Sequence, residues 1–405
     1  MAGLSRVRVS GPLEVYARGF AVELSRQGYA ANSAALQLGL MAHLSRWLAG
    51  GDLDAAGLTP GVLEGFLAAR RLAGYTGYRS PRALVPLLGY LRGLGVAPPP
   101  GPAAAAVGEV EVLLERYRRY LTLERGLAAV TVGDYVGLVR PFLAGRAGVG
   151  GLDLEHLTAG DVSAFVVSAC RESPGGSGKR MTALRSLLGF LHVQGSLRGP
   201  LVGAVPSAAH WRLAGLPQAL EAGQLGRLLA GCDRRSTAGR RDFAVLMLLG
   251  RLGLRRGEVA ALELGDLDWG AGEMLVRGKG NRRERLPLPA DVGQAVAGYL
   301  RRGRPKGAEG RCVFVRVRAP HRALSPAGVT NVVIAAGRRA GLGDVGAHRL
   351  RHTAASEMLR AGASLPEIGQ VLRHRRLAST AIYAKVDREA LRSLARPWPA
   401  AGGAA

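Results

Sequence analysis

Two arginines and two histidines in the second half of the chain are spaced as a phosphate-binding site would require. His348, Arg351 and His352 lie three and four residues apart in a stretch that reads as a helix, which places all three on one face. Arg255 stands where a second expected helix begins. Two guanidinium groups brought together at helix starts can each donate parallel hydrogen bonds to two phosphate oxygens. Either arginine alone would read as a solvated surface charge in a chain this rich in arginine, so the interpretation depends on the residues that accompany them.

The same two histidines have the spacing of a zinc-binding pair, because His-x-x-x-His places two imidazoles on one helical face. The metalloprotease form of this motif requires a glutamate directly after the first histidine, and Arg349 follows His348 here. Arg351 lies between the two histidines, and its charge opposes the binding of a divalent cation. The sequence therefore disfavours a metal site, and we expect no cofactor.

Lys279 is unusual for its residue type, because only four of the 55 basic residues are lysines. It lies between two glycines at the expected tip of a hairpin. An arginine would attract a phosphate equally well, but its pKa lies above ~12 and it does not give up a proton, whereas a lysine can. Lys279 is therefore a candidate general acid, and the alternative is a chance lysine on a solvated turn.

Tyr383 completes this set as a candidate covalent nucleophile. A single tyrosine among apolar neighbours usually belongs to a hydrophobic core, but this one accompanies arginines, histidines and a lysine, without an acidic pair or trio to bind Mg²⁺. Its hydroxyl can form a phosphoester, Lys279 can protonate the leaving oxygen, and His348 can assist proton transfer. The groups that would neutralise charge on the non-bridging oxygens are Arg255, Arg351 and His374.

The composition points to a polyanionic partner. The 405 residues carry a formal net charge of +25, and 48% of them are hydrophobic, which is too many for a disordered basic tail. Folded domains with this charge most often bind nucleic acid, although a GC-rich genome would also enrich arginine. The three cysteines are scattered, which fits a reducing cytoplasm. We expect no signal peptide, no membrane span and a location in the cytoplasm at the nucleoid.

An internal repeat organises the first two hundred residues. Residues 58–66 match residues 157–165, and residues 88–91 match residues 188–191, at an offset of about one hundred residues. Each copy reads as four or five amphipathic helices. In the second copy we expect one helix over about residues 109–124 and another that is capped by Thr158, with Asp161 three residues later.

The remaining residues, from about 216 onward, read as helices around one small antiparallel sheet. Residues 274–277 and 284–288 flank a glycine-rich turn, which predicts a hairpin. We expect a third short strand over residues 313–315. Further on, Ser364 and Glu367 form a capping box at a helix start, and Ser379 should cap a short helix that bears Tyr383 on its second turn.

Taken together, these motifs resemble the tyrosine recombinase (integrase) family, over about residues 107–394. The order is Gly-Leu-Arg-x-x-Glu, a hairpin Gly-Lys-Gly, His-x-Leu-Arg-His, then a histidine followed nine residues later by a tyrosine. Carried over from the family, the catalytic residues are Arg255, Lys279, His348, Arg351, His374 and Tyr383. Supporting positions that brace the site match Glu258 and His352.

The resemblance implies a mainly α fold with two tandem helical SAM-like DNA-binding domains and an α-helical catalytic domain containing a small antiparallel sheet. The expected domains are residues 1–105, 106–205 and 216–396, with a flexible tail at 397–405. Two features depart from the family pattern. Arg373 replaces the usual glycine before His374, and the first copy of the repeat, at about residues 12–96, is additional.

The implied function is that of a site-specific DNA recombinase or integrase of a mobile element. It would cleave and rejoin double-stranded DNA through a 3′-phosphotyrosyl intermediate without a metal, as a homo- or hetero-tetramer on paired sites. The segment after Tyr383, over residues 386–399, would act in a neighbouring subunit. The alternatives are a type IB topoisomerase-like enzyme that relaxes DNA, and a catalytically silent DNA-binding regulator with the same fold.

Overall fold

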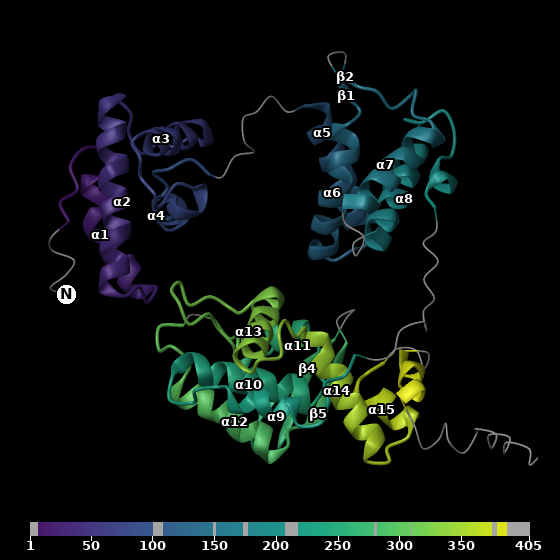
Figure 1. Cartoon of the computed structure of the whole chain (residues 1–405). Coiled ribbons are helices and arrows are strands. Elements are labelled where there is room, and N and C mark those ends of the chain that lie inside the picture. The colour runs from purple at the N-terminus through teal and green to yellow at the C-terminus, as the bar shows by residue number, and fades with distance from the viewer. Residues whose placement is uncertain are drawn as a thin grey trace, which may run out of the picture. The chain divides into compact units, whose positions relative to one another are not determined.

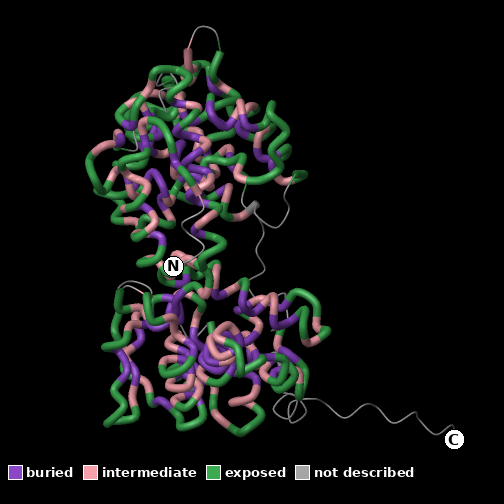
Figure 2. The backbone as a smooth tube through the Cα atoms, turned by 90° about the vertical axis from the view of Figure 1, so that its left-hand side faces the viewer, coloured by how far each residue is buried: buried purple, intermediate pink, exposed green. Residues whose placement is uncertain are grey.

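The structure is a computed structural model that describes residues 7–99, 108–148, 151–172, 177–206, 218–278, 282–308, 310–374 and 379–386. By its internal contacts the chain divides into two compact units. Residues 59–61 and 99–212 form one unit, and residues 1–58, 62–98 and 213–405 form the other. Figure 2 shows buried residues gathered in the interior of the helical parts and exposed residues along their outer turns.

Residues 7–99 form a helical body with its own hydrophobic core. A 3-10 helix (Glu14–Tyr16) precedes four α-helices: α1 (Ala17–Arg26), α2 (Ala31–Gly50), α3 (Pro60–Leu72) and α4 (Pro81–Gly93). The long helix α2 contacts α1 and α4 (Figure 1). Fully buried side chains from all four helices fill the core, among them Phe20, Leu44, Phe66 and Leu91.

The second copy of the repeat forms a similar set of helices around a separate core. These are α5 (Glu109–Arg119), which continues as a π-helical turn (Tyr120–Glu124), α6 (Ala129–Ala144), α7 (Ala159–Glu172) and α8 (Ser177–Val193). A 3-10 helix (Val202–Ala204) and two-residue strands β1 (Ala147–Gly148) and β2 (Gly151–Leu152) complete it. The expected Thr158 cap is present, since the backbone N–H of Asp161 donates to Thr158 Oγ1 at 3.2 Å and the backbone N–H of Thr158 donates in return to Asp161 Oδ2 at 2.9 Å.

The repeated sequence segments fall on corresponding elements of the two helical bodies. The paired segments 58–66 and 157–165 lead into α3 and α7, and the segments 88–91 and 188–191 lie in α4 and α8. The same apolar spacing therefore buries the same faces in both copies.

The C-terminal part is built around helix α10, which other helices surround (Figure 1). Ser236 caps α10 by accepting a hydrogen bond from Gly239 N, and most of the helix is buried because it contacts α9, α12, α13 and α14. The helices are α9 (Gln224–Ala230), α10 (Thr237–Arg251), α11 (Arg256–Ala260), α12 (Ala290–Arg302), α13 (Pro326–Arg339), α14 (Ala347–Arg360) and α15 (Leu365–Val371), with 3-10 helices at Leu264–Asp266 and Ala381–Val386.

The expected hairpin is present, and the sheet is antiparallel. Strand β4 (Glu273–Arg277) pairs with β5 (Arg283–Pro287), with Arg277 opposite Arg283 next to the turn. Residues Met274 and Val276 of β4 are buried and alternate with partly exposed neighbours, as expected for a strand with one face on the core.

The prediction of a third strand over residues 313–315 is wrong. These residues are fully buried, but they form no continuous strand: one isolated bridge, Glu263–Cys312, precedes them, and another, Val315–Ala323, involves their last residue. The third strand of the sheet is instead β3 (Leu267–Asp268), which pairs with β4. A short apolar run is buried both in a strand and in a loop that crosses a core, so this run alone cannot tell a strand from a buried loop.

The predicted mainly helical fold with a small antiparallel sheet is confirmed. Among the helices described above, none is long and apolar enough to cross a membrane.

Candidate active site

Arg351 occupies the centre of the site, with only 1% of its surface exposed. It lies in α14, and its guanidinium donates to two backbone carbonyls, Gly253 O at 2.5 Å and Leu372 O. Burial first, and then the charge of Arg255, lowers the pKa of Arg351 to about 10. The guanidinium is therefore held rigidly and remains charged at neutral pH.

Gly253 permits this arrangement because the backbone turns sharply before α11. Its φ is +62°, in the left-handed region that glycine favours. A Cβ atom at this position would lie 2.5 Å from Leu372 Cδ2, so the leucine side chain would have to move to admit it. The glycine of the Gly-Leu-Arg motif therefore lets the chain approach α14 and α15 closely.

Arg255 precedes α11, and Glu258 holds it there. The backbone N–H of Arg255 donates to Glu258 Oε2 at 2.8 Å, and its Nη1 donates to Oε1 at 2.7 Å. Burial opposes ionisation of Glu258, but these hydrogen bonds and the charges of Arg373 and Arg255 outweigh it, so the pKa lies below its usual value. Glu258 thus orients Arg255 as an ionised, buried carboxylate.

Two histidines on one face of α14 lead to Tyr383. The rings of His348 and His352 are 4.4 Å apart between centroids, in an edge-to-face arrangement. His352 Nδ1 lies 3.0 Å from Tyr383 Oη. Burial, His348 and Arg351 lower the pKa of His352 to about 4, so this imidazole is neutral at pH 7 and its nitrogen can accept the tyrosine proton.

Tyr383 is 2% exposed and packs on a small apolar cluster with Ala355, Ile368 and Leu372. Burial raises the pKa of its hydroxyl, and the charge of Arg351 partly offsets this. The expected short helix that bears Tyr383 is present, as a 3-10 helix (Ala381–Val386), with Tyr383 on its first turn and not on its second. The backbone N–H of Tyr383 donates to Thr380 O at 2.9 Å, and the helix begins one residue later than a cap at Ser379 would place it.

His374 is oriented by Thr380, whose side chain is fully buried. His374 Nδ1 and Thr380 Oγ1 are 2.7 Å apart. The imidazole lies nearly parallel to the Tyr383 ring, with 6.4 Å between centroids. Burial, followed by Arg351 and Arg255, lowers the pKa of His374 to about 4, so its ring is also neutral in the protein without DNA.

A cavity of about 600 Å³ opens beside these residues and is lined in part by Arg255, Gly278, Arg282, Arg373 and His374. A second cavity of about 470 Å³ is lined in part by Arg255, His348 and Arg351. Lys279 lies outside the described residues, but Gly278, its neighbour in sequence, lines the first cavity. The described residues on either side of the turn, Gly278 and Arg282, therefore line the same cavity as Arg255.

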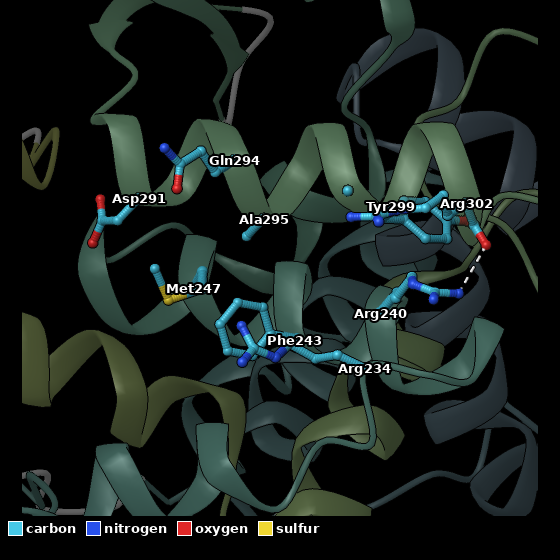
Figure 3. A pocket seen from close by; sticks show the side chains of 10 residues that line it. Arg234, Arg240, Phe243, Met247, Asp291, Gln294, Ala295, Tyr299 and Arg302 are labelled. Atoms are coloured by element: carbon cyan, nitrogen blue, oxygen red, sulfur yellow. Dashed lines mark hydrogen bonds between the residues drawn. The ribbon is translucent and has the colours of Figure 1, made fainter.

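Another cavity, of about 400 Å³, lies between α10 and α12 and shares no lining residue with the two just described (Figure 3). Arg234 lies over the ring of Phe243 there, 4.9 Å from its centroid, and Arg240 donates to Arg302 O. It contains none of the residues expected to perform chemistry.

Three contacts were not foreseen from the sequence. Thr380 binds His374, and Arg373 binds Glu258 at 2.7 Å. His352, expected only to support the site, contacts Tyr383 directly, whereas His348, expected to assist proton transfer, contacts the ring of His352.

Among the described residues no group of three or more histidines, cysteines, aspartates or glutamates could hold a metal ion.

Comparison with known proteins places the chain in a family. Residues 218–390 match the model of the phage integrase family, and residues 114–195 match its N-terminal SAM-like domain. An integrase/recombinase named y4rA from Sinorhizobium fredii (strain NBRC 101917 / NGR234) is 40% identical over 96% of this chain and 95% of its own length. The tyrosine recombinase XerD of Mycobacterium tuberculosis (strain CDC 1551 / Oshkosh) is 31% identical over 69% of this chain and 95% of its own length.

Solved structures share the fold. XerH site-specific recombinase bound to a palindromic difH substrate matches with a TM-score of 0.53 at 17% identity, over 72% of this chain and 98% of that one. A lambda integrase tetramer bound to a Holliday junction matches with a TM-score of 0.53 at 16% identity, over 81% and 92%. With these relatives and this fold, the chain belongs to the phage integrase family of site-specific tyrosine recombinases, which cleave and rejoin DNA strands.

Proposed function

We propose that Tyr383 attacks a DNA phosphodiester and becomes joined to the 3′-phosphate, which releases a 5′-hydroxyl. The observation that carries this proposal is the convergence of Arg351, His352 and His374 on one buried tyrosine. Arg255 and Arg351 bind the non-bridging oxygens of the phosphate, and His374 donates to the same oxygens once the phosphate is bound.

The contact of His352 with Tyr383 supports an assignment of the first proton transfer. The Tyr383 hydroxyl gives its proton to His352 Nδ1 as the oxygen–phosphorus bond forms, because that neutral nitrogen already lies at hydrogen-bond distance. Lys279 protonates the departing 5′-oxygen as the other bond breaks. His348 packs against His352 and holds its ring. In the second half-reaction a 5′-hydroxyl attacks the phosphotyrosine and the same groups act in reverse.

We further propose that the expected domains have separate roles in DNA binding and catalysis. Residues 106–205 and the additional copy at 1–105 contact DNA phosphates, and residues 216–396 perform the chemistry; the separate hydrophobic cores support this division. Removal of residues 1–105 should then weaken DNA binding and make the remaining affinity less dependent on salt concentration. An unchanged salt dependence would contradict this role.

The enzyme would act on paired double-stranded sites as a homo- or hetero-tetramer at the bacterial nucleoid, serving a mobile element. The XerH and lambda integrase structures are complexes with DNA, one of them a tetramer on a Holliday junction. The segment over residues 386–399, which lies outside the described residues from 387 onward, would link neighbouring subunits. A chain ending at Lys385 should bind one site yet fail to pair two.

One experiment separates these proposals from their alternatives. Duplexes bound by the protein are selected from a random pool, and a nick is placed so that the cleaved strand end diffuses away. Three results together would support the recombinase mechanism. The protein–DNA adduct retains the 3′-phosphate, it forms in EDTA, and strand exchange follows only when two sites are present. Relaxation of plasmids without paired sites would favour the topoisomerase-like alternative, and binding without any adduct would favour the silent regulator.

A further inference from the structure

Arg373 has a backbone conformation that is unfavourable for an arginine. Its φ is +55°, in the left-handed region, in the turn between α15 and His374. A residue with a Cβ atom is less stable there than glycine, because its Cβ approaches the following carbonyl oxygen. A side chain at such a position persists when its own contacts compensate, so the contacts of Arg373 indicate what it does.

The side chain of Arg373 turns inward and is only 4% exposed. Its Nη2 donates to Glu258 Oε2 at 2.7 Å and its Nη1 donates to Val371 O at 3.1 Å. The carbonyl of Arg373 also accepts a hydrogen bond from Arg255 Nη2 at 3.3 Å. Arg373 therefore contacts both members of the Arg255–Glu258 pair.

Glu258 is shared between two arginines. Its carboxylate binds Arg255 through Oε1 and Oε2, and its Oε2 also binds Arg373. With Glu258 and Arg255 alone, the formal charges would cancel, and little positive charge would remain for a phosphate. The Arg373 guanidinium adds a second positive charge, so the three side chains together carry a net positive charge. They do so next to a cavity that Arg255 and Arg373 both line.

We propose that Arg373 is a positioning residue that neutralises Glu258, so that Glu258 can orient Arg255 without cancelling the charge that Arg255 presents to the phosphate. Negative charge develops on the non-bridging oxygens in the transition state, and this is where an uncompensated Glu258 would be most harmful. The effect should therefore appear mainly in the rate of cleavage and only slightly in DNA affinity. This inference rests on the proposed role of Arg255 in phosphate binding.

The competing explanation is that Arg373 only shapes the turn that precedes His374. Two variants distinguish these explanations, because Arg373→Gly relieves the backbone strain and removes the charge, whereas Arg373→Met keeps the strain and removes the charge. We expect both to lower the single-turnover cleavage rate on a nicked duplex at least about tenfold, with affinity changed less than about threefold. Arg373→Lys keeps the charge and should retain most of the rate.

The Glu258→Gln substitution supplies the sharpest test, because it removes the charge that Arg373 neutralises. The double variant Arg373→Met/Glu258→Gln should cleave faster than Arg373→Met, although Glu258→Gln alone should cleave more slowly than the native protein. Native-like cleavage by Arg373→Gly, or no gain from Glu258→Gln in Arg373→Met, would overturn the proposal. If thermal unfolding shows that Arg373→Met does not fold, the same comparison is made in Arg373→Gly, which carries no backbone strain.

The proposed function fails separately from this inference. Native protein that forms no adduct through Tyr383 would contradict the proposed mechanism and, with it, the role of Arg373. Native protein that forms the adduct, together with Arg373→Gly that forms it equally fast, contradicts the role of Arg373 alone.

Discussion

His352 Nδ1 lies 3.0 Å from Tyr383 Oη, while the ring of the neighbouring His348 is stacked edge-on against His352. From the sequence, His348 is the residue expected to assist proton transfer, and the resemblance to the family gives His352 a supporting position. Side chains three and four residues apart share a helix face, so their spacing does not tell which of the two histidines contacts Tyr383. That depends on the tertiary position of the 3-10 helix that carries the tyrosine.

Replacing His352 should therefore affect cleavage strongly. His352→Leu removes the acceptor for the tyrosine proton, and we expect cleavage to slow about 10²-fold or more with affinity unchanged. His352→Asn is the matched control, because its side-chain oxygen can take the place of Nδ1, and it should be the faster of the two. Equal rates for His352→Leu and native protein would assign the proton to another group.

Thr380 should matter through its hydroxyl alone. Thr380→Val keeps the shape but removes the 2.7 Å contact with His374 Nδ1, so His374 loses its orientation. A hydrogen bond is worth about 0.5–1.5 kcal/mol, which corresponds to roughly a 2- to 13-fold slower cleavage rate. Thr380→Ser keeps the hydroxyl and should cleave faster than Thr380→Val; the reverse order would show that packing of the methyl group is what matters.

The sequence could predict the helical fold and most of the site, because these depend on local patterns. The capping box at Ser364 and the His-x-Leu-Arg-His helix appear where their spacing placed them. The contacts of Thr380 and Arg373 could not be predicted, because they join residues through tertiary structure. Arg373 did carry a signal, since it stands where the family usually has glycine and its φ is positive.

Lys279 provides a test that relies on sequence alone. Lys279→Arg keeps the charge but cannot donate a proton, so affinity should persist while cleavage slows ~10²–10⁴-fold. A duplex with sulfur in place of the scissile 5′-oxygen has a leaving group that needs no protonation, and it should restore the rate. Absence of this rescue would make Lys279 a phosphate-binding residue instead.

Acid should destabilise the free protein before its carboxylates titrate. The folded-state pKa values of His352 and His374 are both about 4, below the unfolded value of about 6.5. Between these values the unfolded chain binds more protons than the folded one, so stability falls as pH decreases from about 6.5 to 4. Thermal unfolding across this range should show the loss, and His374→Asn should show a smaller one. A Tm independent of pH in this window would mean that the two imidazoles are not held neutral.

Substitution of Tyr383 by phenylalanine tests the central claim most directly. The measurement is a denaturing gel of native and Tyr383→Phe protein on the same nicked duplex, with binding measured in parallel. Only the hydroxyl is lost, so DNA binding should stay within about twofold while the covalent adduct disappears completely. An adduct that persists in Tyr383→Phe would contradict the assignment of Tyr383 as the nucleophile.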